Sequence, residues 1–253
     1  MSPKAAEIAR APAGGATTAT DLPVWYPDFA RRIAELYFSG TTSMFALHGN
    51  TWDLTWMGSG DRYGTLAEFL AEQLFGRWDL VLHHDLARGI RCLAGSNTRR
   101  LKDMVATANR RLGDVSAIDR KPTPALAALD RLVQFNATSD PERRLSCAVI
   151  IEHASFVAPG GDRQGADAAT AIATLMGWAA SPYVKRLNMA FILIDPALSA
   201  ISERLISNPH VAAIEVALPS REDRERYIQA VAGEREAKSL SDYSWPEIAT
   251  LTA

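Results

Sequence analysis

The chain has 253 residues, of which 47% are hydrophobic and 22% charged, and its 27 basic and 29 acidic side chains give a net charge of −2. This composition is ordinary for a folded globular protein, and the near-neutral charge gives no general attraction for nucleic acid or an anionic membrane. Residues 1–21 carry no signal-peptide core, and no apolar run reaches the roughly 18–20 residues of a membrane span. The chain has only two cysteines. We therefore expect a cytoplasmic protein without a disulfide framework.

The elements predicted in chain order alternate between strands and helices. Residues 1–21, rich in Ala, Gly, Thr and Pro, predict a flexible tail, and a helix is expected from Asp28 to Gly40. Short apolar runs predict strands at 44–47, 80–83, 148–151, 189–194 and 213–218, and helical patterns lie at 66–75, 99–112, 124–135, 166–178, 199–206 and 221–231. This order predicts a doubly wound α/β fold, in which a five-stranded parallel sheet lies between two layers of helices.

Polar residues follow the predicted strands at the point where each strand ends. They are His48, His83, His84, Asp85, Glu152, His153 and Asp195. The carboxyl ends of parallel strands share one edge of the sheet, and ligands of open α/β sheets bind there. A mixture of His, Asp and Glu is also able to hold a metal ion, although no His-x-x-x-His or His-Glu-x-x-His spacing occurs. Polar residues are expected wherever a strand stops, so a structural role for each histidine stays open.

Four segments together resemble a known family of ATPases. CAVIIEHA, residues 147–154, has apolar residues followed by an acid, which is the Walker B form. FALHGNTWDL at 45–54, NMAFILID at 188–195 and ISERLISNPHVAAIEVALPSREDRERYI at 201–228 carry the rest of the pattern. Over residues 25–235 the chain resembles AAA+ ATPases of the P-loop NTPase superfamily, and most closely the N-terminal, degenerate module of bacterial tandem AAA-family ATPases.

The resemblance implies cofactors, partners and roles for particular residues. It implies ATP or ADP with Mg²⁺ as cofactors, assembly of like subunits into a ring, and a protein substrate or partner. The segment His48, Gly49, Asn50 and Thr51 stands where the phosphate loop belongs, Glu152 stands where an acid acts on Mg²⁺, and catalytic positions fall on Glu152, His153, Asp195 and Arg204. For Arg204, exposure with pairing to Glu203 or Glu222 is the alternative to contact with a neighbouring subunit.

The hydrolytic parts of this pattern are incomplete. No G-x-x-x-x-G-K-[ST] occurs anywhere in the chain, so the lysine and hydroxyl that hold nucleotide phosphates and Mg²⁺ are missing. His153 replaces the second Walker B acid, and Asp195 stands where a neutral polar residue is usual. We therefore expect weak or absent ATPase activity in this segment alone.

The domain boundaries follow from the same pattern. We expect a AAA+-like domain over 22–236, and the start of a lid or linker of a longer protein over 237–253. Two other functions stay open, namely an autonomous α/β enzyme or metal-binding protein that uses the strand-end residues, and a non-catalytic interaction scaffold. The basic run at 97–121 fits a solvated helix face or a phosphate contact.

Overall fold

The structure is a computed structural model that describes residues 22–161, 165–232 and 241–252. The tail predicted over 1–21 lies outside the described residues. Six strands form the main sheet in the order β5-β4-β6-β7-β1-β8. Their bounds are β1 Met44–Gly49, β4 Leu80–Asp85, β5 Gly89–Cys92, β6 Cys147–Glu152, β7 Met189–Ile194 and β8 Val211–Val216.

The five predicted parallel strands are confirmed, and the structure adds a sixth strand. β5 pairs antiparallel with β4 at the edge of the sheet. A tight turn joins the two strands, because Asp85 Oδ1 accepts hydrogen bonds from the backbone N–H groups of Ala87 at 2.9 Å and Arg88 at 2.8 Å. The four residues of β5 carry Arg91 in their middle, so their apolar signal is too short for recognition in the sequence.

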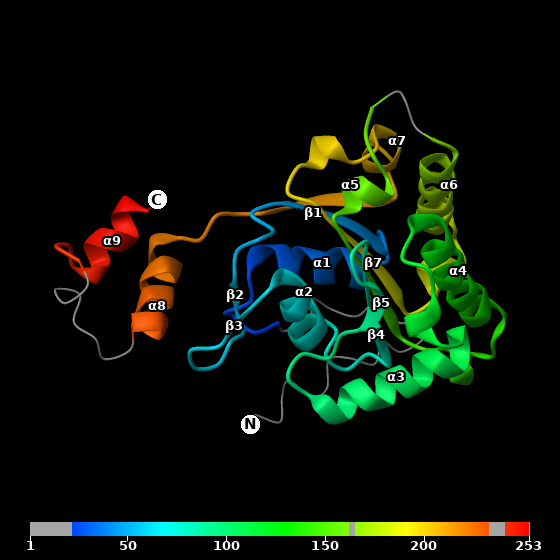
Figure 1. Ribbon diagram of the computed structural model, residues 1–253, viewed down its shortest axis with the longest axis horizontal. Coiled ribbons are helices and arrows are strands. Elements are labelled where there is room, and N and C mark those ends of the chain that lie inside the picture. Colours follow the sequence, from blue (N-terminus) through cyan, green and yellow to red (C-terminus); the bar gives the residue numbers. More distant parts are fainter. Residues whose placement is uncertain (1–21, 162–164, 233–240, 253) are drawn as a thin grey trace.

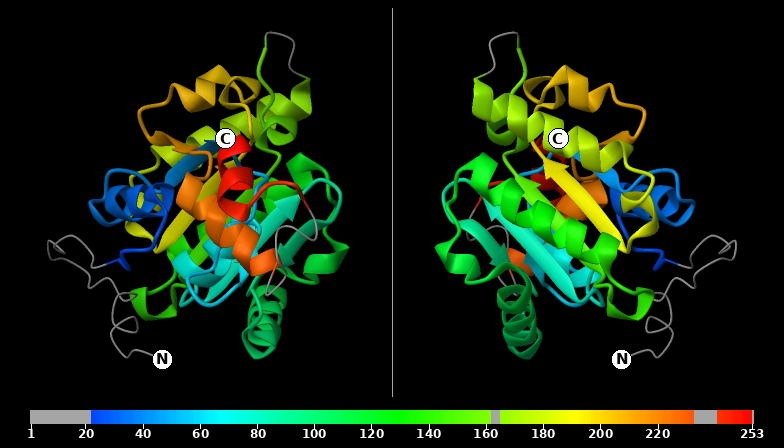
Figure 2. Two further views of the ribbon diagram at one scale, coloured as in Figure 1. Left: turned by 90° about the vertical axis from the view of Figure 1, so that its left-hand side faces the viewer. Right: turned by 90° about the vertical axis from the view of Figure 1, so that its right-hand side faces the viewer.

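Helices cover both faces of the sheet and make the predicted three-layer architecture. Their bounds are α1 Asp28–Phe38, α2 Leu66–Phe69, α3 Thr98–Leu112, α4 Pro122–Thr138, α5 Ala154–Val157, α6 Ala166–Ala180, α7 Glu203–Ile206, α8 Arg221–Ala232 and α9 Trp245–Leu251. Helices α4 and α6 lie side by side on one face of the sheet, and α1 and α2 lie on the other (Figures 1 and 2). The central strands are buried on both faces, which explains their unbroken apolar sequences.

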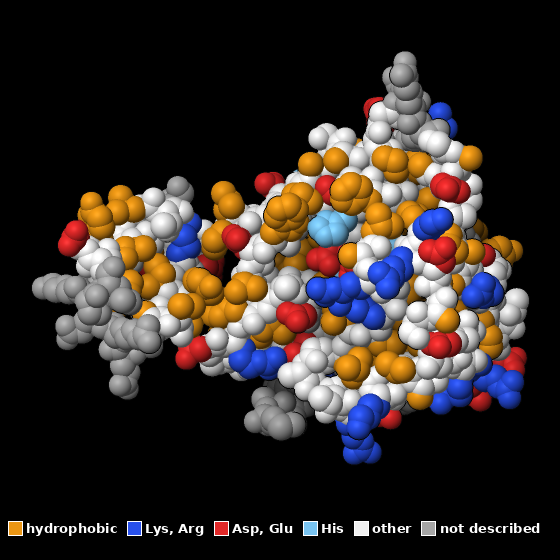
Figure 3. Space-filling model, in the orientation of Figure 1, with side chains coloured by type: hydrophobic (Ala, Val, Ile, Leu, Met, Phe, Trp, Pro, Cys, Tyr) orange, Lys and Arg blue, Asp and Glu red, His pale blue; other side chains and the backbone are white. Residues whose placement is uncertain are grey.

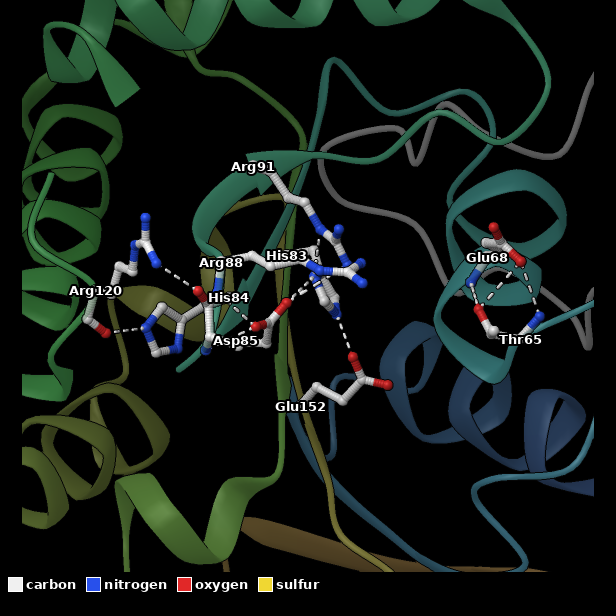
Figure 4. A network of polar contacts seen from close by, with 10 residues as sticks. Thr65, Glu68, His83, His84, Asp85, Arg88, Arg91, Arg120 and Glu152 are labelled. Atoms are coloured by element: carbon white, nitrogen blue, oxygen red, sulfur yellow. Dashed lines mark hydrogen bonds and ion pairs between the residues drawn. The ribbon is translucent and has the colours of Figure 1, made fainter. Parts of the chain in front are cut away.

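Two predicted helices are interrupted. The helix predicted at 66–75 begins with a capping box between Thr65 and Glu68 (Figure 4) and continues from α2 into a π-helical turn, Leu70–Leu74. The helix predicted at 199–206 was wrong in its first half, where a 3₁₀ turn, Leu198–Ala200, precedes α7. Ile201 between them is extended and forms an isolated bridge with Pro159, so the chain is held away from helical geometry there.

The last two helices form a pair that projects from one end of the sheet (Figure 1). Arg224 on α8 donates a hydrogen bond to the carbonyl of Ala249 at 2.8 Å, which joins the two helices, and another to the carbonyl of Pro219, just before α8, at 2.6 Å. A small hairpin of β2, Thr55–Trp56, and β3, Tyr63–Gly64, lies between β1 and α2. Its Tyr63 ring lies 4.9 Å from the ring of Tyr227, so this hairpin supports α8.

Candidate functional site

The loop after β1 stands at the expected phosphate-binding position, and its first amides are already bonded. The backbone N–H of Gly49 donates to Pro196 O at 3.0 Å, that of Asn50 to Val216 O at 2.9 Å, and that of Thr51 to Gly49 O at 2.8 Å. Gly49 has a φ of +90°, and a Cβ at this position would lie 2.8 Å from the oxygen of Val216. Only glycine fits this close approach between the end of β1 and the end of β8.

The rest of the loop is held by side chains. Asn50 Nδ2 donates to Asp53 Oδ2 at 2.7 Å, and the Trp56 ring packs 5.5 Å from that of Trp25. Thr51 is buried, and within the described chain its hydroxyl has no hydrogen-bond partner. Internal polar bonds and aromatic packing therefore shape the connection from β1 to α2, whereas a phosphate loop presents a row of open amides.

The best-defined polar network joins β4, β5 and β6 at the carboxyl edge (Figure 4). His83 is fully buried, and its Nε2 lies 2.9 Å from Glu152 Oε2. Arg91 Nε donates to His83 Nδ1 at 3.1 Å, and its Nη2 lies 3.5 Å from Asp85 Oδ2. Because Nδ1 accepts from a guanidinium, the consistent tautomer carries its proton on Nε2 and donates that proton to Glu152.

This network keeps Glu152 ionised. The hydrogen bond from His83 holds the pKa of the Glu152 carboxyl below its usual range, although partial burial acts in the opposite direction. Its other oxygen, Oε1, has no hydrogen-bond partner in the described part of the chain. Glu152 thus presents a charged and partly accessible oxygen at the end of β6.

His84 belongs to the opposite face of β4, since neighbouring strand residues point to opposite faces. Its Nε2 donates to Arg120 O at 3.0 Å, and its Nδ1 is buried without a partner among the described residues. Burial lowers the pKa of the His84 imidazole. His84 therefore does not join Glu152, and His83 does so in its place.

A metal ion does not fit the His83, Asp85 and Glu152 cluster. One ligand atom from each of these residues lies within 4.8 Å of the others. However, Glu152 lies at Nε2 of His83, while Asp85 lies 4.0 Å from Nδ1 on the other side of the ring. The guanidinium of Arg91 already provides the positive charge beside Asp85. Mg²⁺ also requires octahedral oxygen ligands, which this set lacks.

The other two strand-end residues have different environments. Both oxygens of the buried Asp195 carboxylate accept backbone hydrogen bonds, from Ser155 at 2.9 Å and Ala197 at 3.1 Å, so Asp195 fixes the turns around it. His153 has a φ of +54°, a left-handed conformation, and precedes α5. Its ring lies 6.5 Å from that of Trp52 and 6.2 Å from that of Phe156.

Trp52 and Phe156 make an aromatic surface that the sequence did not indicate as functional. Their exposed fractions are 73% and 66%. We call Trp52, His153 and Phe156 the aromatic surface of the carboxyl edge. Hydrophobic side chains gather around a histidine on the face of the molecule seen in Figure 3, with acidic and basic side chains next to them. Large exposed aromatics of this kind are typical of protein contact sites.

His48 and Arg204 complete the residues indicated by the sequence. His48 is half-buried at the end of β1, in register with Glu215 of β8. Arg204 is exposed on α7, and within the described residues it forms no ion pair with Glu203 or Glu222. The structure thus places Glu152 and His153 together, and no ion pair of Arg204 occurs within residues 22–161, 165–232 and 241–252.

The sheet, its crossover helices and the acid at the end of β6 define a Rossmann-like α/β domain. Residues 13–217 match the family described as AAA+ chaperone, N-terminal Rossmann-like domain. The chain belongs to this family, and the resemblance to AAA+ ATPases is confirmed. No curated protein matches the sequence.

One match among solved structures carries the description "Structure of E. coli MS115-1 HORMA:CdnC:Trip13 complex". The similarity covers 90% of this chain and 64% of that chain, with 14% identity and a TM-score of 0.49. The chain therefore spans less than two thirds of the length of that relative. In the described part of the chain, no helix combines the length and apolar content that a membrane crossing requires.

Proposed function

We propose that this domain is a AAA+ module that does not cradle nucleotide phosphates and that acts through protein contacts within a larger ATP-driven remodelling protein. Hydrolysis would then belong to a second AAA+ module outside this sequence. The observation that carries the proposal is the internal bonding of the Gly49, Asn50 and Thr51 amides, at 2.8–3.0 Å to carbonyls of the same chain. Phosphate binding at this loop would have to break these bonds.

The energetic balance supports the same conclusion. Each buried carbonyl that loses its donor costs about 1–3 kcal/mol. The chain has no lysine after Gly49 in the loop to offset this cost by contact with the phosphates. Without that lysine and the open amides, most of the electrostatic stabilisation that phosphoryl transfer requires is absent. We therefore infer that the domain has no ATPase activity of its own.

The aromatic surface of the carboxyl edge supports a role in protein contacts. Trp52 and Phe156 are the types of residue that contribute most to binding energy when a partner covers them. The ionised Glu152 adds a fixed charge on the same strand end. We infer that another protein chain, rather than a nucleotide, covers this edge of the sheet.

Arg204 offers a second contact with a neighbouring subunit. Its exposed guanidinium has no ion-pair partner among the described residues, so it is available to a carboxylate of another chain. Contacts between two different surfaces of like subunits generate rings when the rotation closes. We infer that Arg204 and the aromatic surface contribute to such heterologous contacts.

A thermal shift experiment tests the nucleotide part of this proposal. The 253-residue chain is heated with ATP or ADP, with and without Mg²⁺. We expect no change in midpoint at millimolar nucleotide. A stabilisation of about 2–3 kcal/mol, the value for ligand at a hundredfold excess over Kd, would contradict the proposal. Turnover that Glu152→Gln abolishes would also contradict it.

Light scattering tests the assembly part. The variants Trp52→Ser, Phe156→Ser and Arg204→Ala are compared with Tyr183→Ser, whose ring is 72% exposed elsewhere on the surface. We expect the first three to lower the average mass of the assembled full-length protein while Tyr183→Ser leaves it unchanged. Equal masses for all four variants would remove these residues from the assembly contacts.

A further inference from the structure

Two neighbouring cavities open at the amino edge of the sheet, opposite the carboxyl-edge site. Their volumes are about 490 and 1060 Å³, and both are lined by Asp79, Arg111 and Leu145. Asp79 directly precedes β4, and Leu145 lies just before β6, so the cavities lie at the beginnings of these strands. The shared residues make the two cavities one continuous groove between α3 and the segment 135–146.

The lining of this groove is rich in arginine. Seven arginines and four acids line it, a net charge of +3 in a chain whose total is −2. Arg100 points inward and donates to the carbonyls of Ala71 at 3.2 Å and Phe75 at 2.8 Å, so its role is structural. The other six define what we call the arginine groove, namely Arg77, Arg99, Arg110, Arg111, Arg143 and Arg144.

None of these six arginines forms an ion pair with another residue in the described ranges. Three of them are nevertheless held in place by other contacts. The guanidinium of Arg111 lies 3.9 Å from the ring centre of Phe135, Arg110 donates to Thr107 at 2.9 Å, and Arg144 donates to a carbonyl at 3.2 Å. These contacts orient the guanidinium groups and leave most of their N–H donors available.

Asp79, an exposed acid shared by both cavities, is held by hydrogen bonds at the starts of two strands. Asp79 Oδ2 accepts hydrogen bonds from the backbone N–H of Ser146 at 2.8 Å and from its hydroxyl at 2.7 Å. This carboxylate is therefore engaged in joining the starts of β4 and β6. Oriented guanidinium groups without a carboxylate partner are suited to bind carboxylates or phosphates of a ligand in a bidentate manner.

The form of the groove favours a peptide over a nucleic acid. Phe135 is the single aromatic residue of the lining, and Arg111 covers it, so bases find no stacking platform. Arg99 and Arg110 lie about 16 Å apart along α3, which about five residues of extended peptide span.

We propose that the arginine groove binds an extended acidic segment of a partner protein, at least five residues long and carrying several Asp or Glu side chains. This site goes beyond the function proposed above. It lies at the other edge of the sheet, roughly 20 Å away by the length of six-residue strands. Binding of the acidic segment in the arginine groove requires neither nucleotide nor the aromatic surface.

Fluorescence anisotropy with fluorescein-labelled octaglutamate tests this proposal on the 253-residue chain. The test variant is Arg99→Ala/Arg143→Ala, because both side chains are exposed and neither has a hydrogen bond within the described structure. The control is Arg131→Ala, an exposed arginine of α4 that does not line the groove. Thermal midpoints confirm that all three proteins are folded.

We expect saturable binding at 50 mM salt and weaker binding at 200 mM salt, since the contacts are ionic. The dissociation constant should rise at least tenfold in the double variant and change less than twofold in Arg131→Ala. No saturable binding by the unchanged protein, or equal losses in the variant and the control, would overturn the proposal. An eight-nucleotide oligothymidylate that binds more tightly than octaglutamate would also overturn it, because the groove would then be a nucleic acid site.

Discussion

Replacement of Gly49 by alanine tests how tightly the end of β1 is held against β8. The new Cβ would lie 2.8 Å from the Val216 oxygen, which also accepts the hydrogen bond from Asn50. The left-handed φ of +90° costs an alanine about 1–2 kcal/mol. The forced shift of the backbone adds about 1–3 kcal/mol, as for other overpacked sites. We expect Gly49→Ala to lower the unfolding free energy by about 3 kcal/mol.

Gly40→Ala separates the two contributions. Gly40 also has a positive φ, +71°, but a Cβ there meets no atom within 4 Å. Gly40→Ala should lower the unfolding free energy only by the conformational cost of about 1–2 kcal/mol. At about 2–4 °C per kcal/mol for a chain of this size, the midpoint should fall by about 6–12 °C for Gly49→Ala and by about 2–8 °C for Gly40→Ala. Urea denaturation gives the free energies, and equal losses in the two variants would refute the reasoning.

Three further substitutions, and a fourth that serves as a control, test other contacts by denaturation. Arg100→Ala should lower the unfolding free energy by about 2–4 kcal/mol, because the carbonyls of Ala71, in the π-helical turn, and Phe75, just after it, lose a charged donor. Arg99→Ala should cost less than about 0.5 kcal/mol, since it changes only the surface. Asp195→Ala leaves two backbone N–H groups unpaired and should cost at least about 2 kcal/mol; a loss below about 0.5 kcal/mol would contradict this role. The pKa of Glu152 is lowered by His83, so its stabilisation is complete above the unfolded value of about 4.3 and is lost as pH falls through the lower folded pKa. Between pH 6 and 3 the unchanged protein should therefore lose more unfolding free energy than Glu152→Gln, and parallel pH curves would count against the pair.

Much of the fold could be predicted because the central strands are buried on both faces. Segments such as β6 and β7 are nearly unbroken apolar runs. Only a few layered architectures are compatible with such an alternation of strands and helices. β5 was missed because a four-residue edge strand is defined by its pairing with β4 rather than by its own composition. The break at Ile201 likewise depends on a bridge to Pro159, which is a tertiary contact.

The sequence could indicate at which edge of the sheet the candidate site lies, but not which side chains within it bond to one another. Glu152 and His153 were indicated because strand ends of a parallel sheet share one edge. The choice of His83 over His84 as the partner of Glu152 depends on which face of β4 each occupies and on the register with β6. Arg91 was not indicated because it lies on the missed strand β5. The sequence near Gly49 also could not indicate that the loop amides are hydrogen-bonded, because the acceptors Pro196 and Val216 are distant in sequence.

The amide protons of Gly49, Asn50 and Thr51 give the most direct measurement of the central claim, which is that this loop is closed by the chain's own carbonyls. Their NMR resonances are followed in isotope-labelled protein during a titration with Mg²⁺ and ATP, together with their hydrogen exchange rates. We predict slow exchange and chemical shifts that do not move with nucleotide. Two results together would show an open phosphate-binding loop and contradict the account. The three amides would exchange rapidly in the protein without nucleotide, and their resonances would shift saturably as nucleotide is added.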